Sequence, residues 1–151
     1  MIKNLRRKTC INLLGKNYIG RLAYISKGEP YVVPITYYYD KENNNIISYS
    51  TEGHKIDSMR ISRAVSLQVD EVTSVNQWQS VVVHGLFEEL HQIDAKFNLH
   101  KFSEGVKKVI GEREKQNPQF IGEFSAKLKG EGLPIVYRIK ILRITGKQRE
   151  D

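Results

Sequence analysis

Four side chains suited to binding an anion lie close together near the middle of the chain: Ser50, Thr51, His54 and Lys55. The residues before them, Ile46–Ser50, have the composition of a β-strand, and those from Lys55 onward have the spacing of a short helix. A helix N-terminus gathers unpaired backbone N–H groups and the positive end of the helix dipole, so it favours a negatively charged ligand. Two hydroxyls, an imidazole and an ammonium group at such a turn predict a phosphate site.

The same turn also fits a purely structural interpretation. Thr51 would then serve as the N-cap of the helix and Lys55 would be solvated, which is the commoner arrangement for such residues. Under either interpretation Ile56 and Met59 form the buried side of the helix, and Ala64–Asp70 returns to strand composition. A strand–turn–helix–strand unit is therefore expected.

The composition is that of one globular domain spanning residues 1–151. Hydrophobic residues make up 40% of the chain and charged residues 27%, both ordinary for such a domain. The single cysteine, Cys10, excludes an intrachain disulfide and a cysteine-rich metal centre. No apolar run approaches the roughly 20 residues of a membrane span, and no leader pattern opens the chain. We therefore expect a cytoplasmic protein with no membrane partner and no bound metal.

The net charge of +7 raises the question of a nucleic-acid partner. The positive residues are dispersed, with small clusters only at Lys3–Lys8 and Lys127–Lys129, and no zinc-finger, aromatic RNP-like or basic-zipper pattern accompanies them. A basic surface that attracts small anionic ligands accounts for this charge, and no specific nucleic-acid partner is expected.

Alternating and β-branched patterns predict a mainly β fold with flanking helices. Turns of Gly, Asn and Ser separate the runs, and Glu71–Gln77 is polar enough to be a loop. Antiparallel strands joined by short turns favour a small six-stranded barrel with helices covering its ends. The six expected strands are Tyr18–Ile25, Tyr31–Asp40, Ile46–Ser50, Ala64–Asp70, Trp78–Leu90 and Pro134–Thr145.

Two further helices are expected at the edges of this barrel. Lys8–Leu14 is amphipathic and is ended by Gly15. Residues 92–111 carry an apolar stripe that should pack on the sheet, formed by Ile93, Phe97, Phe102, Val106 and Val109. A short helix or an irregular segment is expected at Phe120–Phe124.

Two residues interrupt otherwise regular strands. Pro34 lacks the N–H that a central strand would need, so its strand either lies at an edge or bulge or faces a planar ligand with hydrogen-bonding edges. Gly85 indicates a bend or a close approach of two backbones.

The chain contains none of the common motifs of side-chain catalysis. GxSxG, HExxH, the Walker lysine loop and GxGxxG are all absent. A protein that holds a phosphorylated cofactor, and leaves the chemistry to it, fits the phosphate turn better.

Six stretches of the chain carry a family resemblance: GRLAYI (Gly20–Ile25), EPYVVPITYYYD (Glu29–Asp40), YSTEGHKIDSMR (Tyr49–Arg60), SLQVD (Ser66–Asp70), WQSVVVHG (Trp78–Gly85) and ITGK (Ile144–Lys147). In the same order they are similar to the pyridoxamine 5′-phosphate oxidase-like, FMN-binding split-barrel family. Within it, the chain most resembles small flavin-nucleotide-binding proteins that include nitroimidazole-resistance reductases.

This resemblance implies a homodimer of split barrels with FMN in clefts between the subunits. The isoalloxazine edge would contact Val33, Pro34, Ile35 and Thr36, and the phosphate would contact Ser50, Thr51, His54 and Lys55. From the partner subunit, Trp78 and Ser80 would approach the flavin.

The chain departs from the family pattern at two places. Pyridoxamine phosphate oxidases have an arginine–lysine pair where this chain has His54–Lys55 in a turn one residue shorter, and their arginine-rich C-terminal segment is not recognisable here. Many nitroimidazole-reductase relatives have a histidine at the position of Tyr49. The resemblance therefore extends to flavin binding and does not specify either reaction.

Two functions follow from the resemblance. One is an FMN-dependent oxidoreductase that passes electrons through flavin N5 to a small oxidised acceptor. The other is a non-catalytic flavin- or haem-binding protein used for storage, sensing or resistance. Haem would need an axial ligand, and the sequence does not assign that role to any of its four histidines. No catalytic residue is specified by either function.

Overall fold

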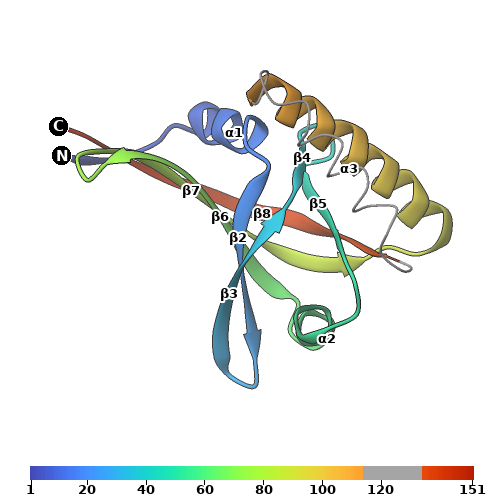
Figure 1. Cartoon of the computed structure of the whole chain (residues 1–151). Coiled ribbons are helices and arrows are strands. Elements are labelled where there is room, and N and C mark those ends of the chain that lie inside the picture. The colour runs from blue at the N-terminus through green and yellow to red at the C-terminus, as the bar shows by residue number, and fades with distance from the viewer. Residues whose placement is uncertain (114–133) are drawn as a thin grey trace.

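The computed structural model describes residues 1–113 and 134–151. Its strands form one antiparallel, strongly curved sheet in the order β3-β2-β6-β7-β8-β5-β4, with β1 added beside β8 (Figure 1). The strands are β1 (Ile2–Asn4), β2 (Ile19–Ser26), β3 (Glu29–Thr36), β4 (Tyr38–Asp40), β5 (Asn45–Ser50), β6 (Ala64–Ser74), β7 (Gln77–Glu89) and β8 (Ile135–Glu150). The helices are α1 (Arg7–Gly15), α2 (His54–Ile61) and α3 (Gln92–Arg113).

The curvature of the sheet brings its two end strands together. β3 and β4 stand at opposite ends of the strand order, yet only Tyr37 separates them in the chain. Tyr37 is fully buried, and its hydroxyl donates a hydrogen bond of 2.7 Å to the carbonyl oxygen of Leu14 in α1. The sheet is therefore a barrel whose two edges meet at one residue and diverge beyond it, which is a split barrel.

The interior of the barrel holds the main hydrophobic core. Leu22, Ile46, Leu67 and Ile139 are completely buried there, and α1 adds leucine side chains at one end. A second cluster lies outside the barrel, where α3 packs through Phe102, Val106 and Ile110 against Ile47, Leu90 and Val136. Among the described helices, none combines the length and the apolar character needed to cross a bilayer.

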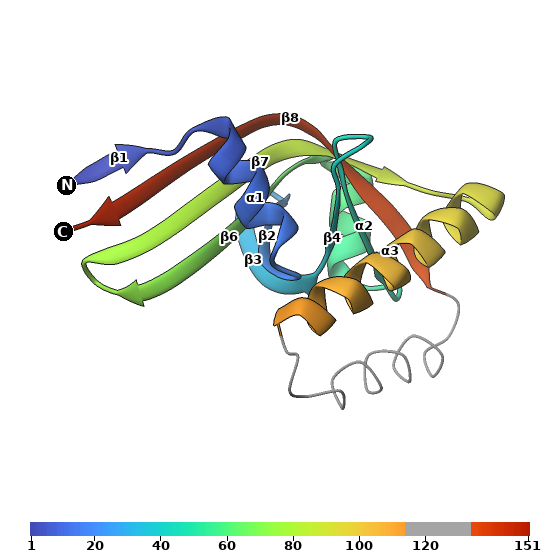
Figure 2. The same ribbon diagram turned by 90° about the horizontal axis from the view of Figure 1, so that it is seen from above.

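Strands β6, β7 and β8 continue past the barrel as a long ribbon. β1 pairs with the end of β8, so both chain termini lie at the far end of this ribbon (Figures 1 and 2). Val72 is 64% exposed here, because the ribbon has no second layer packed upon it at this point.

The expected mainly β fold with flanking helices is confirmed, but three strand assignments were wrong. Tyr31–Asp40 is not one strand, because the chain passes from one edge of the sheet to the other at Tyr37. Glu71–Gln77 is not a loop, since β6 runs to Ser74 and β7 starts at Gln77. The expected last strand, Pro134–Thr145, continues to Glu150. With β1 added, the described residues form eight strands rather than six.

The apolar stripe predicted for residues 92–111 is correct only in its second half. Phe102 and Val106 are buried, but Ile93 and Phe97 are 79% and 63% exposed, and Ile110 rather than Val109 completes the buried face. The segment Phe120–Phe124 lies outside the described residues.

The two residues that interrupt strands now have structural explanations. Pro34 lies in β3, which among the described strands pairs only with β2, so a proline is tolerated at this edge of the sheet. Gly85 sits where the β7–β8 register shifts, and a Cβ atom there would overlap the carbonyl oxygen of Lys140. The expected edge position and the expected close backbone approach are both confirmed.

Candidate functional site

A cleft of about 320 Å³ opens where the two edges of the barrel diverge. One wall comes from β2 and β3, and the other comes from the end of β5 and the turn that leads into α2. The cleft is lined by Ile19, Pro34, Ile35, Thr36, Tyr49, Ser50, Thr51 and Lys55. A hydrogen bond of 2.7 Å from Ser48 Oγ to the carbonyl oxygen of Thr36 joins the two walls at the bottom of the divergence.

Lys55 is the one cation that lines this cleft, as far as the described residues go. Its side chain is half-buried, and burial lowers the pKa of its ammonium group. Within residues 1–113 and 134–151, no hydrogen bond or ion pair joins the Lys55 ammonium to another group. A partly desolvated charge without a counter-ion gains strongly from a bound anion.

The start of α2 leaves its backbone N–H groups without a side-chain cap. Its N-cap residue is Gly53, in an extended conformation with φ 171°, and no side chain of the described residues caps the first turn. The interpretation of Thr51 as N-cap is therefore wrong. Ser50 Oγ donates to the carbonyl oxygen of Thr51 at 3.0 Å, which holds both hydroxyl-bearing residues at the turn.

The acidic residue within this turn is neutralised by an arginine outside the cleft. Glu52 accepts hydrogen bonds of 2.9 and 3.1 Å from the guanidinium of Arg60, which also bonds to Glu89 at 2.7 Å. This network reduces the repulsion that Glu52 would otherwise exert on an anion at the start of α2.

The opposite end of the cleft is largely apolar. Ile35, which is 7% exposed, and Ile19, which is 47% exposed, form an apolar wall of the cleft beside the edge of β3. Strand β3 presents backbone polar groups along that edge, because within residues 1–113 and 134–151 it has a neighbouring strand on one side only. A flat ligand with polar groups at its rim fits this combination.

Six of the ten residues predicted to bind the cofactor thus line one cleft: Pro34, Ile35, Thr36, Ser50, Thr51 and Lys55. Val33 does not line it, because its half-buried side chain packs on the barrel core. His54 is turned away as well: its Nδ1 lies 2.9 Å from the hydroxyl of Tyr24, and its ring borders a second cavity.

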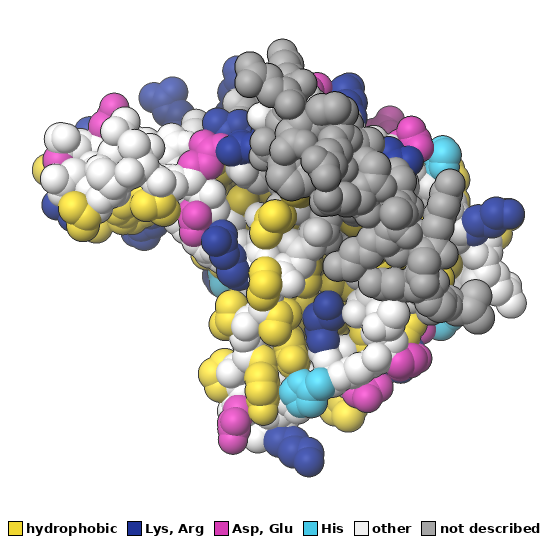
Figure 3. All heavy atoms as spheres, viewed as in Figure 1, with side chains coloured by type: hydrophobic (Ala, Val, Ile, Leu, Met, Phe, Trp, Pro, Cys, Tyr) yellow, Lys and Arg dark blue, Asp and Glu magenta, His cyan; other side chains and the backbone are white. Residues whose placement is uncertain are grey.

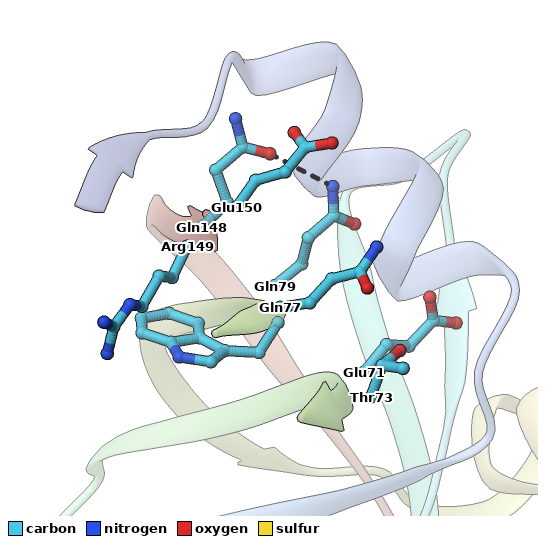
Figure 4. A pocket seen from close by; sticks show the side chains of 8 residues that line it. Glu71, Thr73, Gln77, Gln79, Gln148, Arg149 and Glu150 are labelled. Atoms are coloured by element: carbon cyan, nitrogen blue, oxygen red, sulfur yellow. Dashed lines mark hydrogen bonds between the residues drawn. The ribbon is translucent and has the colours of Figure 1, made fainter. Parts of the chain in front are cut away.

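Trp78 and Ser80 lie on β7, away from the cleft of their own chain. Ser80 Oγ accepts a hydrogen bond of 2.9 Å from Gln68 Nε2. Trp78 pairs with Arg149 across β7 and β8 and borders a polar surface pocket of the ribbon (Figure 4). In that pocket Gln79 Nε2 donates to Gln148 Oε1 at 3.4 Å. An approach of Trp78 and Ser80 to the cofactor from a partner subunit stays a prediction.

Two residues that line the cleft were not predicted as ligand contacts, namely Ile19 and Tyr49. Ile19 pairs directly with Thr36, so the register of the β2–β3 hairpin would have identified Ile19 as a neighbour of the predicted ring contact. Tyr49 precedes Ser50, and its ring packs edge-on against Phe102 of α3 with centroids 5.5 Å apart. That contact depends on the position of α3, which the local sequence does not reveal.

Comparisons with known proteins find chains of similar sequence and fold. An uncharacterized protein of Rhizobium meliloti is 39% identical over 89 residues, an alignment that covers 59% of this chain and 58% of that relative. A crystal structure described as an FAD-binding protein from Mesorhizobium loti is 29% identical, covers 99% of both chains and has a TM-score of 0.75. An FAD-binding protein from Mycobacterium smegmatis is 18% identical, covers 98% of both chains and has a TM-score of 0.61, a likeness of fold.

The family assignment rests on nearly the whole chain. The family model described as pyridoxamine 5′-phosphate oxidase matches residues 6–148, a range that includes every residue of the cleft. The expected resemblance is confirmed, and the chain belongs to the pyridoxamine 5′-phosphate oxidase family.

Proposed function

We propose that the cleft binds a flavin through its FMN portion. The observation that carries the proposal is the half-buried ammonium of Lys55, which has no ionic or hydrogen-bonding partner among the described residues. It lies beside the hydroxyls of Ser50 and Thr51, at one end of a cleft that is apolar at the other. The FAD-binding relative from Mesorhizobium loti, which is similar over 99% of the chain, supports a flavin as the ligand.

The residues present fit the two chemically different ends of such a ligand. Thr51 and Lys55 would donate hydrogen bonds to the phosphate, together with the N–H groups at the start of α2. Ser50 would donate as well once its hydroxyl rotates away from the carbonyl oxygen of Thr51. Pro34, Ile35 and Thr36 would hold the edge of the ring against β3, where the strand lacks a neighbour. None of the described residues lining the cleft is a histidine, so the cleft offers no imidazole ligand for haem iron.

We further propose that the protein is an oxidoreductase acting on a small oxidised acceptor. When bound, the flavin supplies hydride or electron transfer through N5. Among the described residues of the cleft, only Lys55 and Tyr49 have titratable side chains. The protein would therefore contribute mainly by binding and orienting the cofactor and by keeping water from the apolar wall, rather than by side-chain acid–base catalysis.

Flavin binding and redox activity are tested in one preparation. We expect the purified protein to take up FMN and to bind it more tightly than riboflavin, because riboflavin lacks the phosphate that Lys55 would hold. Anaerobic addition of NADH or NADPH, followed by the flavin absorption band, then distinguishes an oxidoreductase, which is reduced, from a storage protein, which is not. Equal affinity for FMN and riboflavin would contradict the phosphate site, and failure to bind either would contradict the function.

We also propose that two chains associate to complete the site. β3 presents apolar side chains to solvent at the border of the cleft: Val32 is 64% exposed, and Pro30 and Pro34 are exposed as well. An assembly that covers this strand would bury apolar surface and would let Trp78 and Ser80 of a second subunit approach the flavin.

Light scattering at micromolar concentration is expected to give twice the 17.5 kDa of one chain. The dimer should persist at high salt, because burial of apolar surface is not screened by ions. A 17.5 kDa monomer that keeps its full flavin affinity would contradict the shared site.

A further inference from the structure

A second and larger cavity, of about 610 Å³, lies beside the start of α2. It is formed by the tip of the β2–β3 hairpin on one side and by α2 on the other. The hairpin turn at Lys27 and Gly28 has positive φ angles of 50° and 79°, typical of a tight two-residue turn. Hydrophobic side chains gather over this hairpin on the face shown in Figure 3.

Three aromatic rings pack together here, and two of them, Tyr31 and His54, line the cavity. Tyr24 and Tyr31 are stacked, with ring centroids 5.4 Å apart and planes at 11°. His54 meets Tyr31 edge-on at 4.8 Å and bonds to the Tyr24 hydroxyl. The Tyr31 ring is 37% exposed, so a flat surface remains open to a ligand. Such a surface suits a nucleobase, because any base can stack on an aromatic ring.

The second cavity is adjacent to the phosphate end of the cleft. His54 borders the cavity and Lys55, the next residue, lines the cleft, so the first turn of α2 belongs to both. Along β3, Tyr31 borders the cavity and Ile35 lines the cleft; four strand residues span about 13 Å. The ring end of the cleft, at Pro34–Thr36, lies on the side away from the hairpin tip.

The cavity also offers groups that recognise a ribose. The Asp57 carboxylate is 69% exposed, and its ion pair with Arg60 is loose, at 3.6 Å. A carboxylate is the usual partner of ribose hydroxyls in dinucleotide sites. An aromatic surface for a base and a carboxylate for a sugar thus lie just beyond the place proposed for the flavin phosphate.

We propose that this cavity binds the adenylate half of FAD, so that the flavin of this protein is the dinucleotide. The proposal rests on flavin binding in the cleft, and it adds a second site with its own residues. Adenine stacks on Tyr31, its ribose hydroxyls bond to Asp57, and the pyrophosphate lies at the first turn of α2 near Lys55.

Calorimetric titration of the flavin-free full-length protein with FMN and with FAD tests this site. We expect FAD to bind more tightly than FMN by about fivefold to a hundredfold, the range that one aromatic–base stack supplies. Tyr31→Ala should remove most of this advantage and leave FMN affinity unchanged. Asp57→Asn should also weaken FAD selectively. Ile93→Ala, at an exposed apolar position of α3 that lines neither the cleft nor the cavity, is the control and should change neither affinity.

The FMN affinity of each variant also reports whether the hairpin is still folded. If the unsubstituted protein binds FMN as tightly as FAD, the adenylate site is wrong while flavin binding stands. The same conclusion follows if Tyr31→Ala weakens both ligands equally. If neither ligand binds, the proposed function fails together with this inference.

Discussion

Replacing Lys55 with alanine is expected to weaken FMN binding by about ten- to a hundredfold. A charge-assisted hydrogen bond contributes about 1.5–3 kcal/mol, and Lys55 is the one lysine that lines the cleft among the described residues. Fluorescence titration of the flavin-free variant measures the loss.

Riboflavin and a second lysine variant separate this effect from general charge. Riboflavin affinity should change little in Lys55→Ala, because riboflavin has no phosphate. Lys96→Ala removes an exposed lysine on α3 and should leave FMN affinity unchanged, although it lowers the net charge equally. An equal loss of both ligands in Lys55→Ala would show that Lys55 only supports the structure.

The same site determines how binding depends on pH. Burial holds the pKa of Lys55 below its usual value in the unliganded protein, and a bound phosphate would raise it again by favouring the charged amine. Because the ligand prefers protonated Lys55, FMN affinity should fall as the pH rises through the lowered pKa. The Lys55→Ala variant should not show this alkaline fall.

Replacing Lys101 with methionine is expected to destabilise the fold by about 3 kcal/mol. This value is at the low end of the cost of removing one partner from a buried ion pair, because Lys101 itself is only half-buried. Its ammonium lies 2.8 Å from the carboxylate of Asp40, which is 3% exposed between β4 and α3. Burial opposes the ionisation of Asp40, but hydrogen bonds from Lys101 and Asn43 outweigh it and keep the pKa below its usual value. Without Lys101, that charge stays buried with Asn43 as its remaining partner.

Urea denaturation at several pH values measures this loss. Because the pKa of Asp40 is lowered by folding, its stabilising contribution is present above the unfolded value of about 3.9 and is lost as the pH falls through the folded value. The difference in free energy of unfolding between the unsubstituted protein and the Lys101→Met variant should therefore become smaller in acid. Lys108→Met, at an exposed position of the same helix, should cost under about 0.5 kcal/mol. If this difference in unfolding free energy stays constant down to low pH, the ionised Asp40 carboxylate is not the group through which Lys101 stabilises the fold.

The sequence predicted those parts of the fold that depend on local pattern. Alternation and turn residues located the β2–β3 hairpin, and Pro34 correctly indicated an edge strand. The break at Tyr37 was missed, because Tyr37, Tyr38 and Tyr39 all favour a strand and only the closure of the barrel separates them. The ribbon around Val72 was taken as a loop, since a strand exposed on both faces shows no alternation.

For the site, the sequence located the turn but not the direction of each side chain. His54 and Lys55 are neighbours, yet successive residues of a helix point about 100° apart, so they border different cavities. The orientation of the Tyr49 ring, which lines the cleft, depends on its packing against Phe102 of α3. The positions of Trp78 and Ser80 relative to a flavin depend on a second subunit, which one chain's sequence does not place.

The pairing of β8 also constrains the order in which the protein can fold during synthesis. β8 joins β7 to β5 and also pairs with β1, so the β4–β5 hairpin is connected to the rest of the sheet through it. The two walls of the cleft, on β3 and β5, therefore belong to parts of the sheet that lie on opposite sides of β8. Before residues 135–150 are available, the chain can form the β2–β3 and β6–β7 hairpins, but no pairing among the described strands yet connects the sheet that carries the ring wall to the strand that precedes the phosphate turn. Flavin capture consequently requires β8 to be in place between β7 and β5.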